Sequence, residues 1–141
     1  MFKKYLIILF CIFLLIGCDK IKNVTNMSEQ QETDARLLYR GLMYGNLEQI
    51  KRHTSPEFFE KIEKNPEFLH DIKKLIPRSD YLQRDVLSVR YDINFLKLLE
   101  KKLIVNYGYQ YDSKRIIYIV EFDVKTKKII DVTISEAISK S

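Results

Sequence analysis

The chain has 141 residues, with 24 lysines and arginines against 19 aspartates and glutamates and a formal net charge of +5. This excess is small and the charges are interspersed, whereas a nucleic-acid binder usually gathers its basic residues into one stripe. Composition therefore argues against nucleic acid as a partner. A glycine-rich phosphate-binding loop is also excluded, because the chain contains only 4 glycines.

The first eighteen residues have the pattern of a bacterial lipoprotein signal. Two lysines precede an apolar run over residues 5–16, which is shorter than the ~20 residues that a helix needs to cross a bilayer. The run ends in Leu15, Ile16, Gly17 and Cys18, which resembles a lipobox. The resemblance implies that residues 1–17 are a signal peptide and that the Cys18 thiol receives a diacylglyceryl group. A secreted protein cleaved nearby and an uncleaved signal anchor stay open as alternatives.

Lipidation would hold the mature protein on the outer, extracytoplasmic or periplasmic face of a bacterial cell membrane. Cys11 lies in the removed segment, so the mature chain has no thiol left for a disulfide. Asp19 resembles the signal that retains enterobacterial lipoproteins in the inner membrane, which favours that membrane over the outer one. The polar residues that follow predict a flexible tether over 18–33.

Residues 34–141 are expected to form a single domain that begins with helices. Apolar residues at three- and four-residue spacing from Asp34 to Ile50 predict an amphipathic helix, either continuous or broken at Gly45-Asn46. Segments 55–64 and 65–74 each open with a capping residue, a proline and a glutamate. This pattern predicts two further short helices.

After Ser79 the apolar residues alternate with polar ones, which predicts strands. The first strand places Leu87, Val89, Tyr91, Ile93 and Phe95 on one face. Three further strands are predicted over 103–111, 115–124 and 130–134, joined by turns of hairpin length. Helices followed by an antiparallel meander define an α+β fold, in which the helices pack on one face of a four-stranded sheet.

The order of the elements, from GLMYGNLEQIKRHTSPEFFEKI to KKIIDVTI, resembles the nuclear transport factor 2-like (cystatin-like) cone fold. The resemblance covers roughly residues 34–134 and is one of topology, since no short motif defines the family. It implies a pocket between the helices and a curved sheet. A helix-on-sheet sandwich of another topology stays open as an alternative.

Enzymes of this fold, such as ketosteroid isomerases, use a carboxylate base in the pocket. Strand alternation places Asp92, Asp131 and Glu121 on the face opposite the apolar residues, so the activity does not carry over. The two histidines, His53 and His70, lie in no metal-ligand spacing. No nucleophile or dinucleotide motif is present either. We therefore expect a protein that is not an enzyme and that uses no metal and no cofactor.

Two functions of different kinds remain. The first is an interaction module that binds another envelope protein through the outer sheet face, where we expect Ile117, Ile119 and Ile129. The second is a small-ligand binder with a pocket lined by tyrosines, although tyrosine is also common in the core of sheets. The expected pocket residues are Tyr91, Tyr107, Tyr109, Tyr111 and Tyr118.

Overall fold

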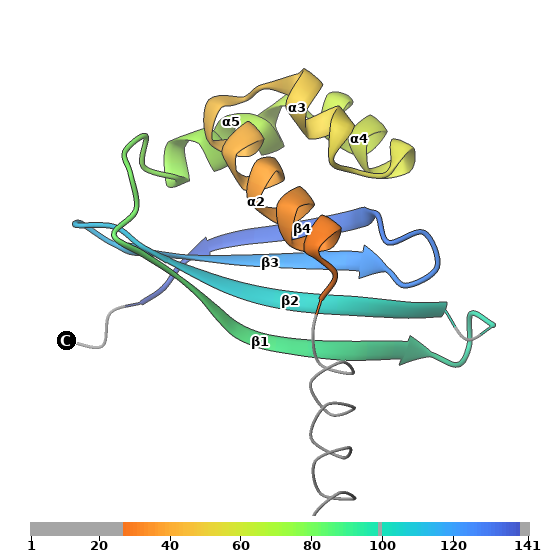
Figure 1. Ribbon diagram of the computed structural model, residues 1–141. Coiled ribbons are helices and arrows are strands. Elements are labelled where there is room, and N and C mark those ends of the chain that lie inside the picture. The colour runs from red at the N-terminus through yellow and green to blue at the C-terminus, as the bar shows by residue number, and fades with distance from the viewer. Residues whose placement is uncertain (1–26, 99, 139–141) are drawn as a thin grey trace, which may run out of the picture.

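The protein, described here by a computed structural model over residues 27–98 and 100–138, has one helical layer on one face of an antiparallel sheet (Figure 1). The predicted α+β class is therefore confirmed. The helices are α2 (Glu29–Tyr44), α3 (Leu47–Arg52), α4 (Pro56–Glu63) and α5 (Pro66–Leu75). The strands are β1 (Gln83–Asn94), β2 (Glu100–Gln110), β3 (Arg115–Asp123) and β4 (Ile129–Glu136), in the order β1-β2-β3-β4.

Each helix begins at a side chain that caps it. The side-chain oxygens of Ser28, Asn46, Ser55 and Asn65 accept the backbone N–H of the residue three positions on. Gly45 ends α2 with φ 65°, in the left-handed region that glycine adopts without strain. The predicted break at Gly45-Asn46 and the two proline-led helices are confirmed.

The domain begins earlier than the sequence predicted. Ser28 and Gln31 form a capping box, in which the Ser28 hydroxyl accepts the Gln31 N–H and the Gln31 side chain accepts the Ser28 N–H at 3.1 Å. Gln31 is buried. The tether prediction is therefore wrong for residues 27–33, which belong to the folded domain. Its remainder, together with Leu15, Ile16, Gly17, Cys18 and Asp19, lies outside the described residues.

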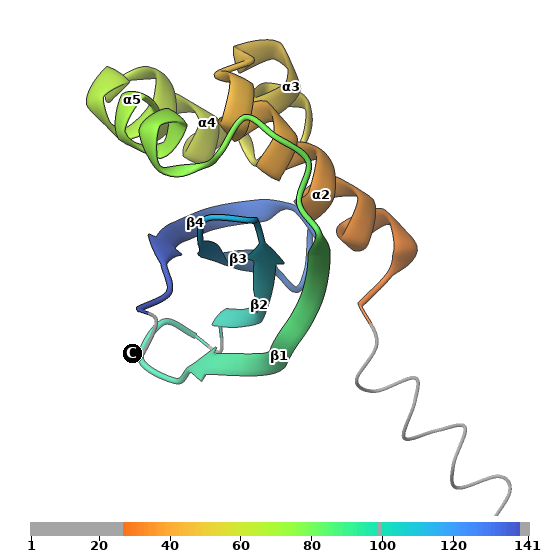
Figure 2. The same cartoon turned by 90° about the vertical axis from the view of Figure 1, so that its left-hand side faces the viewer.

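The core lies between the two layers. It combines apolar residues of all four helices with the inward-facing residues of β2, β3 and β4. Figure 2, seen from one end of the sheet, shows that the sheet is strongly curved and that β1 runs from beside α2 to the side furthest from the helices. The largest fully buried side chains include Leu38, Leu42, Ile50, Tyr107, Tyr109, Tyr118 and Phe122.

Strand β1 is the element whose burial the sequence predicted wrongly. Of the five residues expected in the core, only Val89 packs against it, and Phe95 is 77% exposed. A β-bulge between Val86 and Ser88 bends the strand, and its second half then lies beyond the helical layer. The alternation of apolar residues identified the strand correctly, but it could not show how far the helices extend.

Candidate functional site

Four of the five tyrosines expected in a pocket lie together in the core. Tyr107 and Tyr109 of β2, Tyr111 directly after β2, and Tyr118 of β3 are 0–1% exposed, and Tyr39 of α2 joins them at 2%. The Tyr39 and Tyr109 rings stack with their centroids 3.8 Å apart and an interplanar angle of 6°. The rings therefore occupy the space in which the ligand pocket was expected.

Hydrogen bonds of the buried tyrosine hydroxyls connect α2 to the sheet layer. The Tyr39 and Tyr111 hydroxyl oxygens lie 2.8 Å apart, and the Tyr118 hydroxyl donates to the Ala35 carbonyl oxygen at 3.0 Å. Each hydroxyl thus has the partner that burial requires. These bonds give the tyrosines a structural role that their alternation along the strands does not reveal.

A charged pair, Glu32 and Arg84, lies at the edge of this tyrosine cluster. Glu32 of α2 accepts the Tyr107 hydroxyl at 3.0 Å and forms an ion pair with Arg84 of β1. The Arg84 Nε donates to the Tyr109 hydroxyl at 3.0 Å, and its guanidinium carbon lies 4.5 Å from the Tyr107 ring centroid. The guanidinium therefore contacts both rings and the carboxylate at once.

Burial raises the pKa of all five tyrosines. Desolvation is the largest cause in each case, and the pKa of Tyr109 rises to about 12. A phenol with such a pKa stays neutral near pH 7 and is a poor base or nucleophile. The cluster can donate hydrogen bonds, but its chemistry is that of a rigid core.

Tyr91, the fifth predicted residue, is placed elsewhere. It is 54% exposed on the part of β1 that lies beyond the helices. It lines a hollow of about 230 Å³ together with Ser28 and Lys127. The prediction that it joins the other tyrosines is wrong because β1 curves away from α2.

A groove of about 600 Å³ runs beside the tyrosine cluster, between α2 and residues 79–81. Tyr39 and Tyr109 form part of its lining, and the Tyr81 ring stands edge-on to Tyr109 with centroids 5.0 Å apart. Arg36 and Arg40 of α2 line the same groove. Aromatic rings beside two guanidinium groups suit a flat, anionic ligand.

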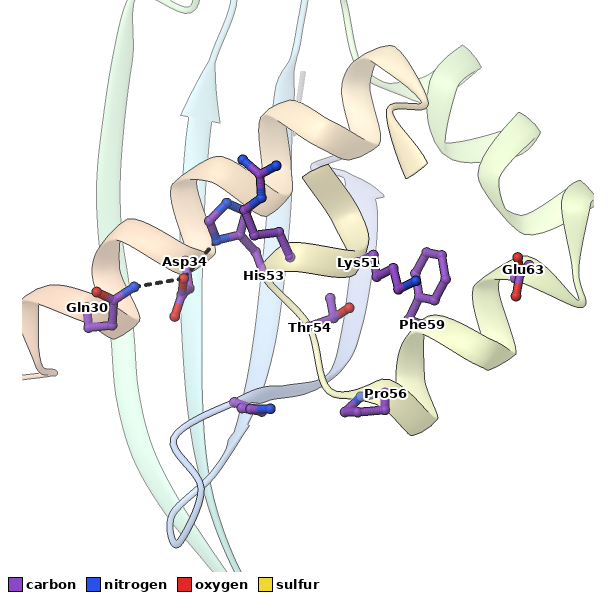
Figure 3. A pocket seen from close by; sticks show the side chains of 10 residues that line it. Gln30, Asp34, Lys51, His53, Thr54, Pro56, Phe59 and Glu63 are labelled. Carbon is purple, nitrogen blue, oxygen red and sulfur yellow. Dashed lines mark hydrogen bonds and ion pairs between the residues drawn. The ribbon is translucent and has the colours of Figure 1, made fainter. Parts of the chain in front are cut away.

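A second pocket, of about 570 Å³, contains a histidine–aspartate pair (Figure 3). The His53 Nδ1 lies 2.8 Å from the Asp34 Oδ1, which also accepts a hydrogen bond from Gln30. Such a pair can orient an imidazole for proton transfer. However, the neighbouring Thr54 hydroxyl donates to the Ile50 carbonyl oxygen at 2.8 Å, so it is not directed at the imidazole as a nucleophile. The pair instead links α2 to the end of α3.

The acidic residues of the strands lie where the alternation predicted. Asp92 and Asp131 are exposed, and Glu121 pairs with Lys102 at 3.4 Å across the uncovered face of the sheet. His70 is exposed on α5. Among the described residues, no group of three or more His, Cys, Asp or Glu side chains could hold a metal ion.

Two of the three isoleucines expected on the outer face of the sheet lie there. Ile117 and Ile119 are half-buried on the face of the sheet that the helices leave uncovered, where Ile104 lies beside them. Ile129 is fully buried in the core and was assigned wrongly. A register shift next to Phe122 pairs Ile129 with that core residue, which reverses the face expected from simple alternation.

Sequence analysis missed an apolar surface at the turn between β1 and β2. Leu96 and Leu98 are 97% and 96% exposed, and Phe95 precedes them. The missed signal was their residue type, because turns are usually built from glycine, proline, asparagine, aspartate or serine.

A scan against models of protein families finds no match, and a search of the curated proteins likewise finds none. Within residues 27–98 and 100–138, no helix is both long and apolar enough to cross a membrane.

Proposed function

We propose that the protein is a lipid-anchored, non-catalytic interaction module on the outer face of a bacterial membrane, where it binds another envelope protein. The observation that carries the proposal is the uncovered sheet face. Helices α2–α5 all lie on the other face (Figures 1 and 2), and isoleucines occupy the centre of the one left open. Gathered apolar side chains on an open face favour a partner site.

The chemistry of this face suggests what the partner brings. Ile119 pairs across the strands with Asn106, whose side-chain oxygen is buried and has no hydrogen-bond partner among the described residues. A buried acceptor without a donor is unfavourable. A partner segment with an apolar side chain and an N–H donor would cover the isoleucines and satisfy the amide. Charges of both signs on the same face, including Arg90 and Asp131, would help to select the partner.

The likeness to nuclear transport factor 2-like domains is part of the same proposal. That family would require helices packed on a curved antiparallel sheet in meander order, which agrees with the arrangement of α2–α5 and β1–β4. The pocket of that family would lie where the tyrosine cluster is packed in this protein. We therefore propose that this chain shares the fold of the family but not its ligand pocket.

The lipid anchor is tested by metabolic labelling with palmitate. We expect the wild-type chain to carry the label and Cys18→Ala to lose it, because the diacylglyceryl group would attach to that sulfur. Cys11→Ala is the matched control and should keep the label, since residue 11 would be removed with the signal peptide. Label that persists in Cys18→Ala would contradict lipidation at this residue.

The partner is tested by mild crosslinking in native membranes, purification of the tagged full-length protein, and mass spectrometry. We expect a stoichiometric envelope protein that is lost from the double variant Ile117→Ser, Ile119→Ser. Leu47→Ser, an exposed residue on the helical layer, is the control and should retain the partner. Circular dichroism verifies that each variant is folded. Retention of the partner by the double variant would exclude this face.

A second candidate function is supported by the groove between α2 and residues 79–81. The same purification would then yield a small anionic aromatic molecule in place of a protein. We expect its recovery to fall in Arg36→Ala and Arg40→Ala, because these guanidinium groups would pair with its charge.

A further inference from the structure

We infer that one end of the sheet docks on the surface of a lipid bilayer that contains anionic lipids. This end consists of the β1–β2 turn, residues 94–98, with the adjoining Lys101 of β2, and the β3–β4 turn, residues 124–128, and we call it the docking end. The inference rests on the proposed membrane anchorage, and it adds which part of the domain faces the lipid. Three independent features of the docking end support it.

The first feature is an apolar tip that contributes nothing to the core. Phe95, Leu96 and Leu98 are 77%, 97% and 96% exposed. The tip has a defined shape, because the Leu96 N–H donates to the Asn94 side-chain oxygen at 3.1 Å. Leu98 adopts φ 51°, which is unfavourable for a leucine. Folding alone does not explain large apolar side chains held in water at a strained turn.

The second feature is a group of lysines that only the fold brings together. The Val124 N–H donates to the Lys101 carbonyl oxygen at 3.2 Å, so the two turns are neighbours, as Figure 1 also shows. The Asp123 carboxylate accepts hydrogen bonds within its own turn, from the Lys125 N–H and from the Thr126 hydroxyl. The exposed lysines at this end are Lys97, Lys101, Lys125, Lys127 and Lys128.

Apolar side chains surrounded by lysines match the chemistry of a membrane interface. The leucines and the phenylalanine can enter the boundary between headgroups and acyl chains, while the lysines pair with anionic headgroups. A protein partner would more often present aromatic residues and arginine in place of lysine. The composition of the docking end therefore favours a bilayer as its occupant.

The third feature is the place where the chain enters the domain. Ser28, which caps α2, borders the same hollow as Val124 and Lys127 of the docking end. Residues 18–27 can span at most about 35 Å when fully extended. An anchor at Cys18 would therefore keep the entry point, and with it the docking end, close to the bilayer.

Tryptophan fluorescence tests the inference, because the natural chain contains no tryptophan. The full-length Leu96→Trp variant is reconstituted into vesicles of phosphatidylglycerol and phosphatidylethanolamine. We expect its emission to shift to the blue and to be quenched by lipids with brominated acyl chains. The matched control is Leu47→Trp on the helical layer, which should show neither effect.

Charge-reversal variants test whether the lysines of the docking end contribute to membrane binding. In the Leu96→Trp background, Lys97→Glu with Lys101→Glu should reduce the blue shift, and added salt should weaken it in the parent. Lys74→Glu, on the exposed surface of α5, is the control and should leave the shift unchanged. A shift of equal size in vesicles of phosphatidylcholine alone would overturn the part assigned to anionic headgroups.

Flotation of the vesicles separates this inference from the anchor. If the chain floats with the vesicles while the tryptophan of Leu96→Trp stays in water, the docking end is wrong and the anchorage stands. If the chain does not float, the anchorage fails, and a blue shift on mixing with vesicles would still support the docking end. A shift that depends on protein concentration without lipid would mean association between copies and would overturn the inference.

Discussion

The substitution Tyr118→Ala is expected to lower the free energy of unfolding by about 3–5 kcal/mol, as for other large aromatic residues removed from a core. Tyr118 is fully buried, and its ring centroid lies 5.1 Å from that of Tyr39 and 5.7 Å from that of Tyr107. Alanine would leave a cavity between the layers and remove the hydrogen bond to Ala35. Because small domains have only about 5–15 kcal/mol in total, urea denaturation should show a large fall in the midpoint.

Two control variants separate the causes of this loss. Tyr118→Phe keeps the ring and removes only the hydrogen bond to Ala35, whose carbonyl oxygen keeps its helical N–H donor within α2, so a smaller loss of about 0.5–1.5 kcal/mol is expected. Tyr91→Ala removes an exposed tyrosine and should change stability by less than about 0.5 kcal/mol. If Tyr118→Ala is no more destabilising than Tyr91→Ala, the tyrosine cluster is not the centre of the core.

Alkaline solution is expected to unfold the domain cooperatively above about pH 10. Burial raises the pKa of five tyrosines in the folded state, to about 12 for Tyr109. In the unfolded chain they ionise near pH 10. Their contribution to stability is therefore complete below pH 10 and is lost as the pH rises through the folded pKa values. Each tyrosine that is still neutral in the folded state but ionised in the unfolded chain lowers the free energy of unfolding by up to about 1.4 kcal/mol per pH unit.

Tyrosinate absorbance and circular dichroism, recorded on the same samples, test this expectation. The five buried tyrosines should ionise in one step that coincides with the loss of secondary structure. Smooth ionisation of all tyrosines near pH 10 with retained structure would contradict the burial of the cluster.

Local sequence patterns predicted much of the fold because they have local physical causes. The apolar period changes after Ser79, and this change separates the helical layer from the sheet. Capping residues and prolines marked the starts of α4 and α5, and Gly45 marked the end of α2. Each signal acts within a few residues, so it can be read without knowing the rest of the structure.

The errors arose where distant parts of the chain determine the outcome. Tyr91 and Tyr107 were both expected on the apolar, core-facing side of their strands. Only Tyr107 is covered by α2. Ile129 faces the core instead of the outer face because the register shifts where its strand pairs with β3. The lysines of the docking end lie on two turns that are separated in the sequence and adjacent in space. Burial, register and surface charge therefore required the three-dimensional structure.

The meander order of the strands has a consequence for the time at which each layer can fold. Neighbouring strands are consecutive in the chain, so the sheet can form from short hairpins soon after its residues are available. The bonds between the layers join residues 72 and 83 positions apart, as in Tyr39–Tyr111 and Ala35–Tyr118. During synthesis the helices therefore appear first, and until β2 and β3 exist α2 can pack only against other helices such as α3 and α5. A chain that crosses a membrane from its N-terminus would therefore complete the core between its two layers only after β2 and β3 have followed the helices across.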